Sequence, residues 1–164
     1  MSEHKIFARH SGVKPADRLP IPLIKRCIQM ALLTEGVDMP CEISVLITDE
    51  RGIQKVNYEF RGIREPTDVL SFPMHVFSPP GWANPGVVAI DHETGLVPLG
   101  EIVFSGERVH NQARQYGNLL DRETAYLTVH SVLHLLGFDH VDEALGKMHM
   151  REHENKILKA MGLF

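Results

Sequence analysis

Three histidines in the second half of the chain, His130, His134 and His140, have a spacing that suits a metal site. The first two are four residues apart, so on a helix their side chains share one face, roughly 5–6 Å apart at Cβ. Gly137 follows, and glycine readily adopts the left-handed conformation that ends a helix and turns the chain back. His140 then has a route to the same point as the other two. Three imidazoles with no fourth protein ligand nearby in the sequence are typical of a catalytic zinc site with an open position.

A fortuitous histidine pair is the alternative, because the chain contains 10 histidines in 164 residues. His149 and His153 are also four residues apart, but charged residues surround them and no glycine turn or third histidine follows. We interpret this second pair as part of a solvated helix face. The 130–140 segment is instead rich in leucine, valine and phenylalanine. Unpartnered imidazoles buried there would each cost about 1–3 kcal/mol, and one metal ion supplies a partner for all three.

The chemistry of such a site depends on the residue beside the first histidine. Zinc on three histidines lowers the pKa of its bound water to about 7 and polarises a carbonyl or phosphoryl oxygen. The same ligand spacing occurs in metzincin peptidases, where a glutamate after the first histidine is the general base. Ser131 occupies that position here, and a serine hydroxyl is no base near neutral pH. The ligand pattern therefore fits a metalloprotease, whereas the chemistry does not.

A second cluster, residues 57–73, places Arg61 and Arg64 ahead of a Pro-Thr-Asp turn and a short predicted strand. The planar guanidinium group of arginine offers a fork of donors that matches a phosphate. The alternative is that Arg61 pairs with a surface acid and that the Pro-Thr-Asp turn has no functional role. The residues alone leave both interpretations open.

The elements that must position these residues follow from hydrophobic periodicity and capping. Asp121 is predicted to cap the helix that carries His130 and His134. Further helices are predicted over 22–35, after Asp49, from Ser105 to Gly117 and over 142–162, and strands over 5–9, 41–48, 68–72 and 101–104. Strands interspersed with helices and a helical end predict an α+β domain with a mixed sheet.

Residues 78–98 are rich in proline and glycine. Two short apolar runs, 87–90 and 96–97, flank a turn-rich stretch over 91–95, which predicts a small hairpin. We interpret the segment as a loop or hairpin insertion.

The composition is that of an ordinary globular protein, with 43% hydrophobic and 23% charged residues. A length of 164 residues predicts one domain over 1–164. No apolar run is long enough for a membrane span, and Cys27 and Cys41 fall at predicted core positions, which favours the cytoplasm. The net charge of −4 argues against a generally basic nucleic-acid-coating protein but does not exclude a local basic site.

Three stretches together resemble the YbeY family of metal-dependent endoribonucleases, which act in ribosomal RNA maturation. The family carries His-Gly-x-Leu-His-Leu-x-Gly-Tyr-Asp-His, and residues 130–140 match it. Its upstream Asn-x-x-Tyr-Arg-Gly and Pro-Thr-Asp-Val-Leu-Ser-Phe-Pro stretch is matched by 57–73, and its Leu-Gly-Asp-Ile strand by 99–102. Ser131 replaces a glycine of the family, Phe138 a tyrosine and Glu101 an aspartate, and Phe60 keeps the aromatic ring before the arginine.

The resemblance implies a zincin-like single domain, with a mixed sheet packed against helices and the metal-site helix near the C-terminal end. It implies one zinc ion held by His130, His134 and His140, and a role in cleavage for Arg61 and His130. Arg64 is a further predicted substrate-binding residue. Asp139 and Glu101 are predicted to support the ligands without binding the metal.

The function implied is zinc-dependent cleavage of single-stranded RNA in the processing of ribosomal RNA, at the 3′ end of 16S rRNA, and in ribosome quality control. The expected partners are ribosomal RNA and either ribosomal small-subunit proteins or an assembly GTPase. No membrane association is expected. Two alternatives stay open: a ribosome-assembly factor that works by binding and has a structural zinc, and a metzincin-like metalloprotease whose base lies elsewhere, for instance at Glu101.

Overall fold

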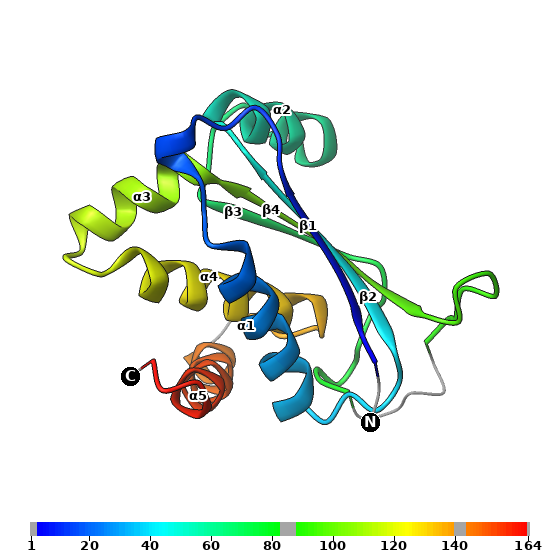
Figure 1. Cartoon of the computed structure of the whole chain (residues 1–164). Helices are drawn as coiled ribbons and strands as arrows, with labels where there is room; N and C mark the ends of the chain where they lie inside the picture. The colour runs from blue at the N-terminus through cyan, green and yellow to red at the C-terminus, as the bar shows by residue number, and fades with distance from the viewer. Residues whose placement is uncertain (1–2, 83–87, 140–143, 164) are drawn as a thin grey trace.

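A four-stranded mixed sheet forms the centre of the fold (Figure 1). The computed structural model describes residues 3–82, 88–139 and 144–163. The strand order is β1-β2-β4-β3, with β1, β2 and β4 parallel and β3 antiparallel to β4. The strands are β1 (Lys5–His10), β2 (Cys41–Thr48), β3 (Val69–Pro73) and β4 (Val97–Ser105). The predicted α+β class with a mixed sheet is confirmed.

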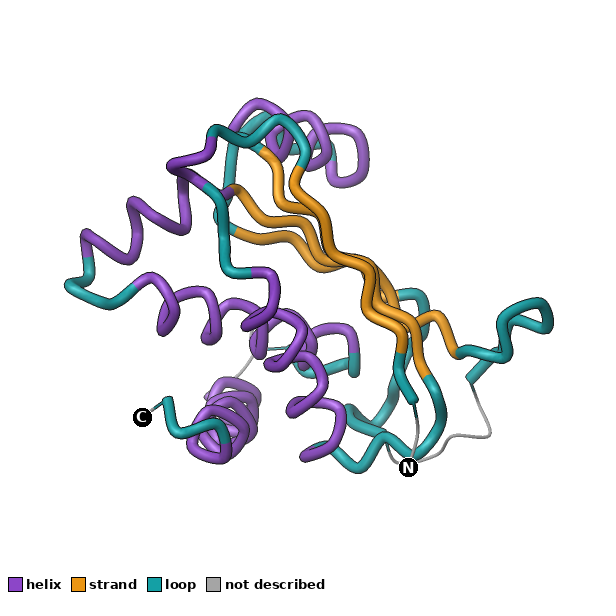
Figure 2. Tube along the Cα trace, viewed as in Figure 1, coloured by secondary structure: helices purple, strands orange, loops and turns teal. Residues whose placement is uncertain are grey.

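Helices cover both faces of this sheet, as Figure 2 shows. The main core joins α1 (Ile21–Thr34), α4 (Leu120–Leu135) and α5 (Ala144–Ala160) to one face. A smaller core packs α2 (Glu50–Arg61) against the other face, through Ile53 on Leu70 and Val103. A 3-10 turn, η1 (Pro15–Asp17), contacts α3 (Gly106–Gln115). The main core thus lies on one face of the sheet and the smaller core on the other.

Helix α4 is the central helix, and it packs against α1, α3, α5 and β3. Val129, Val132, Leu133 and Leu135 are fully buried in it because neighbours surround the helix on most sides. The histidines at 130 and 134 are only half-buried. They therefore lie on the one side of α4 that core packing leaves accessible.

The end of α4 is a glycine-terminated cap. Gly137 has φ +94°, its N–H donates to the carbonyl of His134 at 3.0 Å, and the N–H of Phe138 donates to that of Leu133 at 3.0 Å. This pair of bonds is the Schellman arrangement that closes a helix on a left-handed residue. The predicted turn at Gly137 is confirmed, and the chain reverses immediately after the histidine pair.

Two of the three predicted helix caps are confirmed. The Asp49 carboxylate accepts from the N–H of Gly52 at 2.7 Å, and the Ser105 hydroxyl accepts from that of Arg108 at 3.3 Å. The prediction for Asp121 is wrong, because the N-cap of α4 is Leu119. Asp121 lies in the first turn instead, where the positive end of the helix dipole favours an acidic side chain.

Within 78–98, predicted as a loop or hairpin insertion, the described residues contain a turn but no strand before β4. Residues 88–90 form no strand, and 97 belongs to β4, which begins four residues earlier than predicted. Only the turn is present, where the N–H of Asp91 donates to the carbonyl of Leu96 at 2.8 Å. The start of this segment packs beneath the end of α4, since the N–H of Gly81 donates to the carbonyl of Leu136 at 2.8 Å.

Both cysteines are core thiols, as predicted. Cys27 and Cys41 are fully buried and free, and burial raises the pKa of each to about 12. Among the helices of the described residues, none has the length and apolar character needed to cross a bilayer.

Candidate active site

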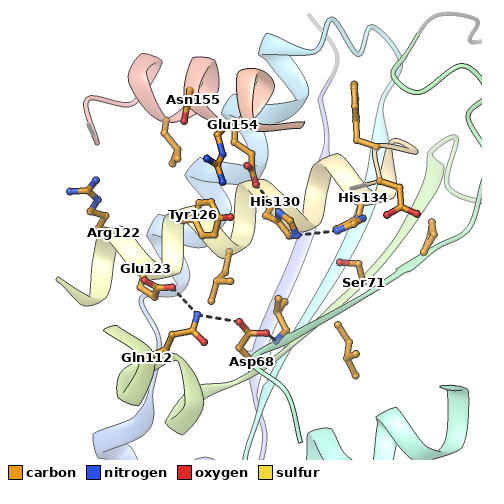
Figure 3. A pocket seen from close by; sticks show the side chains of 18 of the residues that line it. Asp68, Ser71, Gln112, Arg122, Glu123, Tyr126, His130, His134, Glu154 and Asn155 are labelled. Carbon is orange, nitrogen blue, oxygen red and sulfur yellow. Dashed lines mark hydrogen bonds and ion pairs between the residues drawn. The ribbon is translucent and has the colours of Figure 1, made fainter. Parts of the chain in front are cut away.

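The histidine pair on α4 is convergent. The Nε2 atoms of His130 and His134 lie 3.0 Å apart, and their rings meet edge to face with centroids 4.6 Å apart (Figure 3). Helical spacing puts both side chains on one face, and packing of α4 turns that face toward a cleft. Two ring nitrogens thus face one small region of space, within hydrogen-bond distance of each other.

A carboxylate from α5 fixes the first of these rings. Glu154 is 4% exposed, and its Oε2 lies 2.6 Å from Nδ1 of His130. An ionised carboxylate accepts, so Nδ1 of His130 carries the proton and Nε2 is left to face His134. Sequence reasoning placed the helix segment around Glu154 on a solvated face, and that prediction is wrong for this residue. His149 is exposed, but His153 also contacts protein, with Nδ1 2.7 Å from Oε2 of Glu35.

The histidine pair lies in a cleft of about 1300 Å³. The cleft is bounded by the end of α2, strand β3, and helices α3, α4 and α5 (Figure 3). Arg61, the last residue of α2, lines it together with His130 and His134. Among the described residues Arg61 is exposed and has no ion-pair partner. The structure therefore brings this arginine to the histidines and does not support the alternative that it is tied to a surface acid.

Arg64 is not brought to the cleft. Its guanidinium carbon lies 4.5 Å from the centre of the Tyr58 ring, and its NH2 group donates to the Tyr58 hydroxyl at 3.1 Å. This pair belongs to a separate shallow hollow on the outer side of α2. Arg61 and Arg64 are close in the sequence, but α2 ends at Gly62 in the left-handed conformation. The chain that follows Gly62 therefore leads away from the cleft.

A network of polar side chains lines the cleft toward the N-terminal end of α4. The amide of Gln112 donates to Asp68 at 3.2 Å and to Glu123 at 2.9 Å, and Asn118 donates to Glu123 at 3.2 Å. Glu123 is 4% exposed, so these amides satisfy a buried carboxylate. The network links Asp68, just before β3, to α3 and α4 along the lining of the cleft.

Tyr126 lies one turn before His130, with ring centroids 5.8 Å apart, and it lines the cleft. Burial, followed by the nearby Glu154 carboxylate, raises the pKa of the Tyr126 phenol. The phenol stays protonated near neutral pH and is therefore a hydrogen-bond donor to a ligand in the cleft. The i, i+4 spacing from His130 is a signal that could have identified Tyr126 from the sequence.

The remaining predicted residues have different positions. Asp139 is exposed and lines the cleft beside Gly137. Glu101 does not line the cleft. Its side chain alternates with that of the core residue Ile102 and so lies on the α2 side of the sheet, where its cross-strand neighbour is Phe72. Ser131 is fully buried and also outside the cleft lining. Position 140, the third predicted ligand, lies outside the described residues.

The geometry of the two described histidines, His130 and His134, is compatible with zinc. Two nitrogen ligands on one tetrahedral zinc, each about 2.0–2.1 Å from it, lie about 3.3 Å apart, close to the 3.0 Å between the two Nε2 atoms. A carboxylate on the far nitrogen of a histidine is also typical of metal-bound imidazole. Within residues 3–82, 88–139 and 144–163, no three His, Cys, Asp or Glu side chains form a metal-holding group. Of the three predicted ligands, the described residues include His130 and His134, which lie together.

The fold and the cleft define an α+β protein with a histidine pair and an arginine in one groove, and comparisons with known proteins place it further. The family model described as Endoribonuclease YbeY matches residues 15–162. The Endoribonuclease YbeY of Caldicellulosiruptor bescii is 50% identical over 122 residues, 74% of each chain. That of Clostridium kluyveri is 42% identical over 157 residues, 92% of this chain and 94% of its own. The chain belongs to the YbeY family.

A solved structure supports the fold. The solution structure of TM1509 from Thermotoga maritima aligns with a TM-score of 0.53 and 23% sequence identity. The alignment covers 94% of this chain and 91% of that one.

Proposed function

We propose that the protein is a zinc-dependent endoribonuclease that cleaves single-stranded RNA during the processing of ribosomal RNA. The observation that carries the proposal is the convergence of the Nε2 atoms of His130 and His134, 3.0 Å apart, in a cleft that also holds Arg61. The relatives named Endoribonuclease YbeY support an RNA substrate. Maturation of the 16S rRNA 3′ end and ribosome quality control are the parts of this process that we assign to it.

His130 and His134 would hold the zinc, with His140 as the predicted third ligand. The ion would supply Lewis acidity at a phosphoryl oxygen and a bound water of lowered pKa. Glu154 keeps the proton of His130 on Nδ1, so that Nε2 is free of a proton when the metal binds. The ring of His130 is also held in one orientation by this contact.

Arg61 binds the scissile phosphate in this proposal. Its position at the rim of the cleft, without a protein acid as partner among the described residues, leaves the guanidinium available to an anion. A guanidinium fork stabilises the charge that develops on phosphoryl oxygens in the transition state. Tyr126 supplies a second donor on the α4 side of the cleft.

The metalloprotease alternative has less support in the structure. Its required base is absent from position 131, and Glu101 lies on the other side of the sheet from α4. The alternative of a binding factor with a structural zinc needs a closed set of four protein ligands. Ribosomal small-subunit proteins or an assembly GTPase as partners, and a cytoplasmic location, stay predictions.

The experiment combines elemental analysis of the purified protein with cleavage of an end-labelled ribosomal RNA precursor. His134→Ala is expected to lose both zinc and cleavage, whereas His149→Ala, an exposed histidine of α5, is expected to keep both. A His134→Ala protein that cleaves at the normal rate would overturn the proposal. An unstructured protein incubated in parallel tests for peptidase activity. A metal-free variant that still supports ribosome maturation would favour the binding factor.

A further inference from the structure

An exposed aromatic ring stands at the mouth of the cleft. Phe60 precedes Arg61 at the end of α2, is 70% exposed and lines the same cleft. Single exposed apolar side chains are common on proteins and need no explanation by themselves. Phe60 differs from an exposed residue such as Phe7 on β1, because Phe60 shares a cleft with Arg61 and the histidine pair, and Phe7 does not.

One side of the Phe60 ring is supported by protein. Its centroid lies 5.4 Å from that of Phe72, with the ring planes at 55°. Phe72 in turn packs on the small core of Ile53, Leu70 and Val103 beneath α2. An aromatic side chain has only two rotatable bonds, and contact with a packed neighbour restricts them further. Phe60 therefore presents a ring that needs little ordering when a ligand binds.

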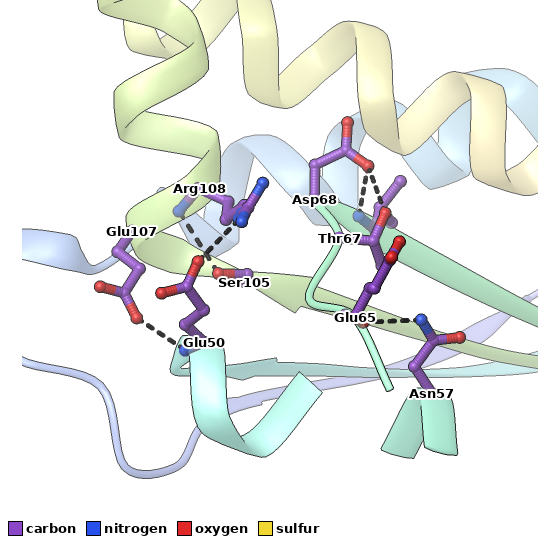
Figure 4. A network of polar contacts seen from close by, with 9 residues as sticks. Glu50, Asn57, Glu65, Thr67, Asp68, Ser105, Glu107 and Arg108 are labelled. Carbon is purple, nitrogen blue, oxygen red and sulfur yellow. Dashed lines mark hydrogen bonds and ion pairs between the residues drawn. The ribbon is translucent and has the colours of Figure 1, made fainter. Parts of the chain in front are cut away.

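The backbone below this ring is also fixed. Gly62, with φ +71°, closes α2 by donating to the carbonyl of Tyr58 at 2.9 Å. The side chain of Asn57, 4% exposed, donates to the carbonyl of Glu65 at 2.8 Å and ties the following loop to the helix (Figure 4). The helix end that carries Phe60 and Arg61 is thus held from both sides.

An aromatic face beside a cation is the pairing that single-stranded nucleic acids bind. Unpaired bases stack on aromatic side chains, while the neighbouring phosphate contacts arginine or lysine. The base of a duplex has both faces covered by its neighbours, so a single stacking platform favours unpaired strands. Because Phe60 and Arg61 both line the cleft, one nucleotide can contact Phe60 with its base and Arg61 with its phosphate.

We propose that Phe60 binds an unpaired nucleobase by stacking, next to the phosphate held by Arg61, and that this contact contributes the preference for single-stranded RNA. The inference rests on the proposed RNA substrate and adds a residue that selects the form of that RNA. Phe60 touches the substrate but not the reacting bond, so its removal weakens binding more than it slows the cleavage of bound RNA.

The test measures binding of a short single-stranded RNA with 2′-fluoro sugars and phosphorothioate linkages, which resists cleavage. One strand contains 2-aminopurine, whose fluorescence reports stacking, and a second has an abasic residue in its place. Phe60→Ala is expected to weaken binding of the first strand roughly 5- to 150-fold and to reduce the fluorescence change. Phe60→Trp is expected to restore both. Phe7→Ala, a 55% exposed phenylalanine outside the cleft, is the matched control and is expected to have no effect.

The abasic strand separates stacking from a structural effect. With no base to stack, it is expected to bind Phe60→Ala and the unsubstituted protein equally. Equal weakening of both strands, or unchanged binding of the 2-aminopurine strand by Phe60→Ala, overturns the inference but not the proposed function. Failure of the unsubstituted protein to bind either strand overturns the RNA substrate and the inference together.

Discussion

The Glu154 carboxylate lies 2.6 Å from Nδ1 of His130 and so joins helix α5 to helix α4. Replacing Glu154 by glutamine keeps the size and an acceptor oxygen but removes the charge. Loss of such a partner typically lowers metal affinity 10- to 100-fold. We therefore expect Glu154→Gln to bind zinc roughly 10- to 100-fold more weakly, measured by competition with a chromophoric chelator.

Glu152→Gln is the matched control, because Glu152 is exposed on the same helix. It is expected to bind zinc as the unsubstituted protein does. Unchanged zinc affinity in Glu154→Gln would show that the carboxylate does not act on the metal site through His130.

Arg61 and Arg64 are three residues apart, yet only Arg61 lines the cleft. Arg61→Ala is expected to retain zinc and to cleave RNA roughly 100- to 1000-fold more slowly, as for other donors aimed at developing charge. Arg64→Ala removes the same charge from the hollow around Tyr58 and is expected to change cleavage little. The measurement is single-turnover cleavage with zinc content determined on the same samples. Equal losses in the two variants would contradict a role for Arg61 within the cleft.

The arrangement of the α4 histidines could be predicted because its signals are local. Periodicity places His130 and His134 on one helix face, and Gly137 ends the helix at the predicted turn. Glu154 could not be found in this way, since its partner is 24 residues distant and the charged residues around it indicate a solvated face. Only the packing of α5 on α4 buries it.

Strand β4 shows a second limit. Pro98 and Gly100 indicate a break in the chain, but the register with β2 shifts there, with Glu42 opposite Pro98 and Ile43 opposite Gly100. Such a bulge accommodates residues that a regular central strand excludes. The strand is buried on both faces over 102–104, so its apolar run does not reveal on which side Glu101 lies. That side is decided by pairing with β3.

The turn at Gly137 leads to a prediction about stability. A Cβ atom there would lie 2.7 Å from the carbonyl oxygen of Phe77, and φ is +94°. Gly137→Ala combines left-handed strain with overlap and is expected to lower the free energy of unfolding by about 3 kcal/mol. Gly117→Ala, with φ +67° and open space around the added methyl group, should cost only about 1 kcal/mol. Denaturant unfolding of both variants measures the two losses of unfolding free energy. Equal losses would show that Phe77 moves to accommodate the added methyl group.

Two histidines near the N-terminus predict how stability depends on pH. Nδ1 of His4 accepts from the N–H of Cys41, and Nε2 of His10 accepts from that of Leu19, both at 3.0 Å. Burial lowers the pKa of His4. The pKa of His10 is lowered by burial and, to a smaller extent, by the charge of Arg18, while the hydrogen bond from the N–H of Leu19 acts in the opposite direction. The folded state therefore binds protons less readily than the unfolded chain, in which the pKa is about 6.5.

The stability that these two contacts contribute is thus fully present above pH 6.5 and falls as the pH is lowered through the unfolded and then the folded pKa. His4→Asn and His10→Gln keep an acceptor oxygen near each lost nitrogen but do not titrate. The double variant is expected to lose less stability between pH 7 and pH 5 than the unsubstituted protein, in urea unfolding at a series of pH values. If both proteins lose the same amount, His4 and His10 do not govern the acid sensitivity of the fold.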